Sequence, residues 1–129
     1  MAALYPFRAL RPVPDAAARV ASVPYDVVST DEARALAHGN PLSFLRVTRA
    51  EIDLPAETNP YDPAVYDQAS RAFEELKRAA PLVLDERPSL YFYRLRMGSH
   101  QQTGLCGCFS IDEYDAGTIK KHERTRKEK

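Results

Sequence analysis

With 129 residues, the chain is long enough for one domain with a hydrophobic core and too short for two ordinary domains. Its 44% hydrophobic and 28% charged residues exclude a disordered chain, and no apolar run approaches the roughly 20 residues that span a bilayer. The 18 basic and 18 acidic side chains balance, so any binding to nucleic acid must involve a local basic patch. The presence of only two cysteines excludes a disulfide scaffold and favours a cytoplasmic location.

Prolines interrupt the first third of the chain. Each proline restricts the residue before it to extended conformations, so no long helix is expected there. We expect a short strand or extended segment over residues 4–10, two helical turns over 15–21, and an extended loop over 23–28.

The next segment begins with a helix signal and continues with a strand signal. Ser29 and Glu32 have the spacing of a capping box, which predicts a short helix that Gly39 closes. The sequence of residues 42–48 predicts a strand, and the polar, proline-bearing residues 49–60 predict a surface loop.

The strongest helix signal follows. Asp62 as the N-cap and Pro63 at the first helical position predict a helix with one apolar face that runs to about Ala80. Residues 82–84, Leu-Val-Leu, predict a short buried strand.

The last strands and helix come in quick succession. Residues 90–97 and 103–109 predict a hairpin around a turn at 98–99, and Ser110 is a weak cap for one helical turn before Gly117. The fold class expected for residues 1–129 is therefore a single α+β domain, with a mixed, largely antiparallel sheet and two or three helices.

The final ten residues are the most distinctive segment. Residues 120–129 carry a net charge of +4, so residues 1–119 of the neutral chain carry −4. Such a segment favours a phosphate or another anion, although a solvated charged helix has the same composition. The candidate phosphate ligands are Lys120, Lys121 and Arg126, and the candidate catalytic pair is His122 and Glu123. Because the segment lacks a closing turn and an apolar anchor, we expect the domain to be truncated at its C-terminus.

Three secondary candidates and two cysteines are the other residues that could take part in binding or catalysis. Tyr25 can stack on a ring and Asp26 can bind a hydroxyl or a metal, but both also suit an ordinary turn. Arg8 faces either a cleft or solvent. Cys106 and Cys108 share a strand face at a spacing too long for an unstrained disulfide, and no other ligands complete a zinc site. We predict that both cysteines are small buried residues, and no metal site is expected.

Four motifs together resemble a known family. They are Pro6–Pro12, Pro24–Val28, Asn40–Leu45 and Ile119–Glu123. In this order they resemble the N-terminal portion of the bacterial and archaeal family called domain of unknown function 1015, whose longer members are often labelled ParB-like. The resemblance implies a fold similar to the ParB/sulfiredoxin superfamily, which includes nucleotide-binding switches and a free-serine kinase. It also implies that residues 120–123 form the functional segment.

The resulting hypothesis is a nucleotide- or phosphate-handling domain, either a small-molecule kinase of the free-serine type or a nucleotide-gated switch. As an enzyme it would be a phosphotransferase, its cofactor would be a nucleotide with Mg²⁺, and its partner a nucleotide or phosphorylated small molecule. The alternative is a ParB-like DNA-binding regulatory protein whose basic tail contacts backbone phosphates. A third class, a protein-interaction module, would bind neither ligand.

Overall fold

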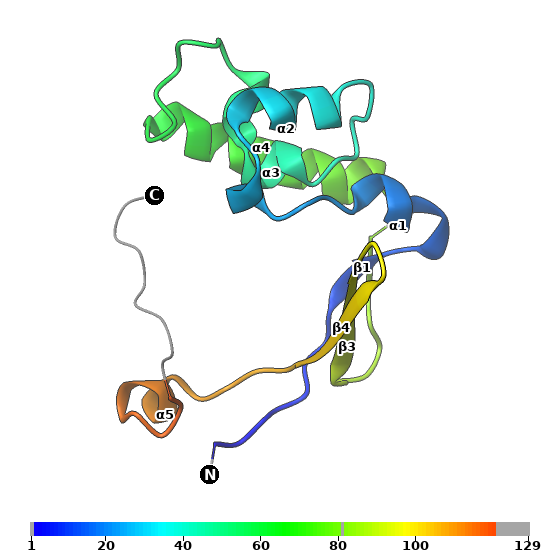
Figure 1. Ribbon diagram of the computed structural model, residues 1–129, viewed down its shortest axis with the longest axis vertical. Coiled ribbons are helices and arrows are strands. Elements are labelled where there is room, and N and C mark those ends of the chain that lie inside the picture. The colour runs from blue at the N-terminus through cyan, green and yellow to red at the C-terminus, as the bar shows by residue number, and fades with distance from the viewer. Residues whose placement is uncertain (1, 81, 121–129) are drawn as a thin grey trace. The chain divides into compact units, whose positions relative to one another are not determined.

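The computed structural model describes residues 2–80 and 82–120, which contain both helices and strands (Figure 1). This confirms the mixed α+β class. The chain divides into two compact units. We call Leu10–Leu84 the helical unit, and the described residues of Met1–Ala9 and Asp85–Lys129 the hairpin unit. No helix in the described ranges is long and apolar enough to cross a membrane.

The helical unit consists of short helices and one small sheet. Its helices are α1 (Pro14–Val20), η1 (Tyr25–Val27), α2 (Thr30–Ala37), α3 (Leu45–Thr48), η2 (Ala50–Asp53) and α4 (Pro63–Ala79), where η marks a 3-10 helix. Its strands are β1 (Leu10–Pro12) and β2 (Leu82–Leu84), which pair antiparallel with Arg11 opposite Val83. The predicted strand at 82–84 is confirmed, but its predicted burial is wrong, since Val83 is 51% exposed.

Capping residues set the start of α2 and α4, as predicted. Ser29 Oγ accepts the N–H of Glu32 at 3.3 Å, while the Ser29 N–H donates to Glu32 Oε2 at 2.8 Å, which completes the capping box. Asp62 Oδ1 accepts the Ala64 N–H at 2.8 Å and Pro63 occupies the first turn. Gly39, with a φ of 69°, follows α2 as expected.

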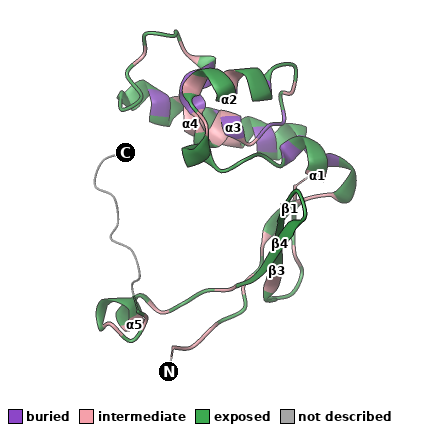
Figure 2. Ribbon diagram, in the orientation of Figure 1, coloured by how far each residue is buried: buried purple, intermediate pink, exposed green. Residues whose placement is uncertain are grey.

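Every buried side chain in the described ranges belongs to the helical unit (Figure 2). Some of these buried residues form two apolar clusters. One cluster consists of Val20, Leu42, Leu76 and Ala80, and the other of Ala33, Ala37, Leu45 and Ile52. These clusters supply the hydrophobic stabilisation of the helical unit.

The predicted strand over residues 42–48 is wrong, because α3 begins at Leu45. Leu42 lies in the turn before α3 and packs in the cluster of Val20 and Leu76, whereas Leu45 starts the helix and packs in the cluster of Ala33, Ala37 and Ile52. Arg46 stabilises this turn, since its Nη2 donates to the carbonyl oxygen of Ala37 at 3.0 Å.

Two segments that were predicted as loops contain helical turns. The start of the expected surface loop at 49–60 is the buried 3-10 helix η2, and the expected extended loop at 23–28 contains η1. Two side chains tie η2 to α2: Arg49 Nη2 donates to Thr30 Oγ1 at 2.9 Å, and Thr30 Oγ1 donates to Glu51 Oε1 at 3.3 Å. Such bonds between distant residues have no local sequence signal.

The hairpin unit contains β3 (Tyr91–Met97), β4 (His100–Cys106) and α5 (Ile111–Asp115). The predicted hairpin and terminal helical turn are confirmed, but the second strand begins and ends three residues before the expected range of 103–109. Gly98, with a φ of 59°, makes the turn. The N-terminal segment is extended, as expected. It joins this unit through isolated antiparallel bridges between Tyr5 and Cys108 and between Phe7 and Ser89.

Candidate functional site

Helix α5 positions the candidate site immediately before the basic tail. The Glu113 N–H donates to Ser110 Oγ at 3.4 Å, a weak N-cap that starts the helix. After α5 the chain turns at Gly117, whose φ is 72°. The Ile119 N–H then donates to the carbonyl oxygen of Glu113 at 3.2 Å. This bond returns the chain to the helix and fixes Ile119 beside it.

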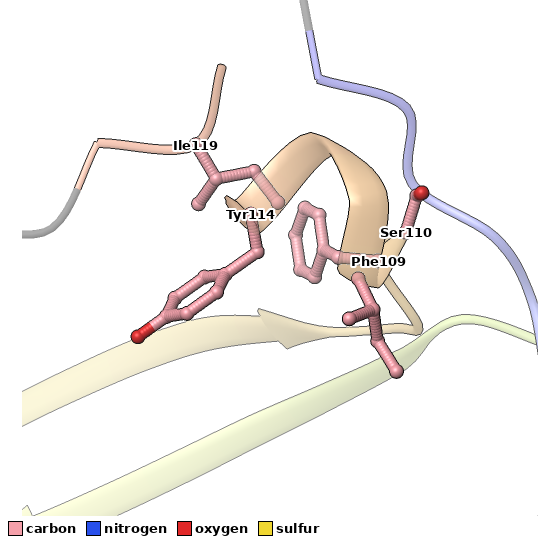
Figure 3. A pocket seen from close by; sticks show the side chains of 5 residues that line it. Phe109, Ser110, Tyr114 and Ile119 are labelled. Atoms are coloured by element: carbon pink, nitrogen blue, oxygen red, sulfur yellow. The ribbon is translucent and has the colours of Figure 1, made fainter. Parts of the chain in front are cut away.

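A hollow of about 280 Å³ lies beside α5 (Figure 3). Its lining is formed by Phe109, Ser110, Ile111, Tyr114 and Ile119, so four of the five side chains are apolar or aromatic. Ile111 is 75% exposed and Phe109 is 52% exposed, which leaves the hollow open to solvent. The volume lies near the lower end of small-molecule sites, which measure roughly 300–1,000 Å³. We call this feature the α5 hollow.

The N-terminal segment holds the base of the α5 hollow in place. The Ala3 N–H donates to Glu113 Oε2 at 3.1 Å. Tyr5 and Cys108 exchange two backbone hydrogen bonds, at 2.9 and 2.8 Å. Residues more than 100 positions apart therefore meet at α5, which makes the hollow a tertiary feature of the hairpin unit.

Lys120 is the one tail candidate within the described residues. It is exposed and directly follows Ile119, which lines the α5 hollow. The remaining tail candidates lie outside the described residues: Lys121, His122, Glu123 and Arg126. The basic segment therefore begins one residue after the last lining residue of the hollow.

Arg8 belongs to a hydrogen-bonded cluster of the hairpin unit. Its side chain is exposed, and its Nε donates to the carbonyl oxygen of Asp85 at 2.6 Å. The Tyr91 hydroxyl lies 2.6 Å from Asp85 Oδ2 and accepts the Ala9 N–H at 3.0 Å. The Phe7 and Tyr91 rings pack with their centroids 4.9 Å apart. These interactions give the Phe7-Arg8-Ala9 segment a structural role.

Tyr25 and Asp26 lie in η1 of the helical unit, whereas Arg8 and Lys120 belong to the hairpin unit. Both η1 side chains are exposed, and Tyr25 retains 49% of its accessible surface. Neither residue lines the α5 hollow. The secondary candidates thus occur at separate places in the chain.

The prediction that both cysteines are buried is wrong. Cys106 is half-buried and Cys108 is exposed, and both are free thiols. Strand β4 ends at Cys106, so Cys108 lies beyond the hairpin in the segment that pairs with Tyr5. Within residues 2–80 and 82–120, no three His, Cys, Asp or Glu residues are grouped as a metal site.

Sequence reasoning missed the apolar residues of the α5 hollow. Ile111 and Tyr114 have the three-residue spacing of one helical face, and Phe109 precedes them closely. In a helix of five residues, such an apolar face next to a basic segment is a signal that could have been recognised. The contribution of Ile119 could not, because it depends on the turn at Gly117.

Comparison with protein-family models matches residues 4–129 to the family described as "Protein of unknown function (DUF1015)". No curated protein and no solved structure matches the chain, and nothing in these comparisons supports a ParB-like classification. Because the family match covers nearly the whole chain, and includes the hairpin unit, the α5 hollow and the basic segment, the protein belongs to the DUF1015 family.

Proposed function

We propose that the protein is a nucleotide- or phosphate-handling domain that binds a nucleotide at the α5 hollow. The observation that carries the proposal is the continuity of an aromatic hollow with a basic segment, because the lining residue Ile119 is followed directly by Lys120. A nucleotide has the same two parts, an apolar ring system and a chain of anionic phosphates.

The lining of the α5 hollow suits a nucleobase. Phe109 and Tyr114 are both partly exposed and both line the hollow, so a planar ligand there would lie against aromatic side chains. Ile111 and Ile119 add apolar walls without a competing charge. Stacking on an aromatic side chain contributes about 1–3 kcal/mol per base in single-stranded nucleic acid complexes.

The basic segment suits the phosphates. Lys120, Lys121 and Arg126 supply charge-assisted donors in this proposal, and such hydrogen bonds are stronger than neutral ones. His122 and Glu123 supply the proton acceptor and the ligand for a nucleotide-bound Mg²⁺, if the domain transfers a phosphoryl group. The reaction class is then a phosphotransferase of a small molecule, whereas a switch would need only the binding step.

The charge of α5 favours a nucleotide with its Mg²⁺ over a continuous DNA backbone. Asp112, Glu113 and Asp115 place three carboxylates on this short helix, next to the basic tail. A long polyanion lying across the tail would be repelled by these carboxylates, while a compact ligand accompanied by a cation would not. This is the reason for preferring the nucleotide over the ParB-like alternative.

Isothermal titration calorimetry with ATP, GTP, inorganic phosphate and duplex DNA tests the proposal. Tyr114→Ala and Lys120→Ala should each weaken binding of one nucleotide by about 5- to 100-fold, and Tyr114→Phe should retain it. Matched controls are Tyr66→Ala and Arg78→Ala, which remove exposed side chains from α4. Equal affinity in all variants, or affinity that rises with DNA length and not with nucleotide identity, would refute the proposal.

A further inference from the structure

The second notable surface is one face of the β3–β4 hairpin. Phe92, Arg94 and Arg96 alternate along β3 and therefore share a face. The residues opposite them in β4 are Leu105, Thr103 and Gln101, which lie on the same face of the antiparallel pair. We call these six residues the Phe92 face. It is separate from the α5 hollow, because none of the six lines that hollow.

The Phe92 face is strongly exposed. Phe92 retains 82% of its accessible surface, and all six residues are exposed. A buried core normally takes up a phenylalanine, and a two-stranded hairpin alone is only marginally stable in water. A ligand that covers the Phe92 ring would therefore stabilise the hairpin as well as bind to it.

The positive charge of the β3–β4 hairpin indicates that its ligand is an anion. From Arg87 to Ile111 the sequence contains no aspartate or glutamate. Arg94 and Arg96 make no side-chain hydrogen bond or ion pair with the residues that the structure describes. Their Cα atoms lie about 7 Å apart, as set by the strand rise. Two unpaired arginines on a face without carboxylates complement a polyanion.

We propose that the Phe92 face binds single-stranded nucleic acid. Arg94 and Arg96 contact phosphates, and the Phe92 ring stacks on an unpaired base, the combination that sequence-tolerant single-strand binding uses. Thr103 and Gln101 are neutral, and they offer hydrogen bonds to base edges beside the arginines. A duplex fits less well, because its bases are already stacked on one another. An acidic protein segment would use the arginines but not the ring of Phe92.

The proposal is tested on the full chain by fluorescence anisotropy with a labelled single-stranded oligonucleotide of about 12 nucleotides, within the usual site sizes for single-strand binding. Phe92→Ala should weaken binding about 5- to 100-fold, and Phe92→Tyr should restore it, since the ring is retained. Arg94→Ala with Arg96→Ala should reduce the slope of log affinity against log salt by about 1.4, or about 0.7 for each phosphate that the variant no longer neutralises.

The chain offers matched controls for both effects. Met97 is 81% exposed and lies on the opposite face of β3, so Met97→Ala removes a similarly exposed side chain without touching the Phe92 face. Arg71→Ala with Arg78→Ala removes two exposed arginines from α4. Both controls should bind the oligonucleotide like the parent chain.

Several outcomes would overturn the proposal: no binding by the parent, a reduction in Met97→Ala equal to that in Phe92→Ala, or equal affinity for a duplex. Competition by an acidic peptide as effective as that by the oligonucleotide would assign the face to a protein partner instead. Failure here is distinguishable from failure of the nucleotide proposal, because Tyr114→Ala should leave oligonucleotide binding intact and Phe92→Ala should leave nucleotide binding intact.

Discussion

The hydroxyl of Tyr91 donates a hydrogen bond to Oδ2 of Asp85 at 2.6 Å. The same hydroxyl oxygen accepts the Ala9 N–H at 3.0 Å. The Tyr91 side chain at the start of β3 therefore joins the N-terminal segment to the segment that begins at Asp85. Because the hairpin unit has no buried side chain among its described residues, we expect such polar interactions to contribute much of its stability.

Tyr91→Phe tests that contribution. The variant keeps the ring that packs on Phe7 but leaves the Asp85 carboxylate and the Ala9 N–H without the hydroxyl. We expect a decrease of about 1–3 kcal/mol in local stability, the range for an unmade partly buried hydrogen bond. Hydrogen exchange of the Ala9 amide should accelerate. Tyr93→Phe, at a mostly exposed position of the same strand, is the control and should change nothing.

Gly107→Ala should loosen the base of the hairpin. A Cβ at Gly107 would collide with the Leu4 side chain and lie 2.9 Å from Leu90 Cδ2. Both leucines would have to move, which costs about 1 kcal/mol, the lower end of the range for overpacking. Hydrogen exchange at Cys108 should report the change. In contrast, a Cβ at Gly104 meets only the Tyr93 carbonyl oxygen at 3.9 Å, so an equal effect in both variants would show that the contacts of Gly107 are not the cause.

Leu45→Ala should strongly destabilise the helical unit. Leu45 is 2% exposed and is the largest fully buried side chain in the described part of the chain. Its truncation leaves a cavity between α2, α3 and η2, with an expected cost of about 2–5 kcal/mol in the free energy of unfolding. Urea denaturation measures this cost. Leu36→Ala in α2, at a position that is 56% exposed, should cost much less.

The capping box of α2 makes a pH-dependent contribution. The backbone N–H of Ser29 and then its hydroxyl donate to the Glu32 carboxylate, and these bonds lower the pKa of Glu32 from its ordinary value of 4.5. Because the pKa is lower in the folded state, the stabilisation is present above about pH 4.5 and is lost as the pH falls through the folded-state pKa.

An NMR titration of the Glu32 side chain checks this sign. In Ser29→Ala the hydroxyl bond is absent, so the pKa of Glu32 should rise toward 4.5, and the fall in α2 stability on acidification should become smaller. Ser22→Ala, which removes an exposed hydroxyl outside the capping box, is the control. The same Glu32 pKa in all three chains would show that Ser29 does not hold the carboxylate.

Local signals in the sequence predicted the elements that are determined locally. The caps at Ser29 and Asp62 and the turn at Gly98 each depend on a few neighbouring residues, and all three were identified correctly. The segment at 42–48 was misassigned because α3 depends on tertiary packing of Leu42 and Leu45, which overrides its strand-like composition.

The candidate site could be predicted only in part, for the same reason. The basic segment is visible in composition alone, and its first residue, Lys120, directly follows Ile119, which lines the α5 hollow. The hollow itself depends on the return of Ile119 to Glu113 and on the bond from Ala3, neither of which a local pattern encodes. The roles of Lys121, His122, Glu123 and Arg126 stay predictions.

NMR chemical-shift mapping shows whether the α5 hollow is the nucleotide site. On addition of ATP with Mg²⁺ to the labelled full chain, we expect the largest amide shifts over residues 109–120. We also expect Tyr114→Ala to remove these shifts and Tyr66→Ala to leave them unchanged. If the largest shifts occur instead at Tyr25 and Asp26 in η1, or if no amide of residues 109–120 responds, the α5 hollow is not the nucleotide site.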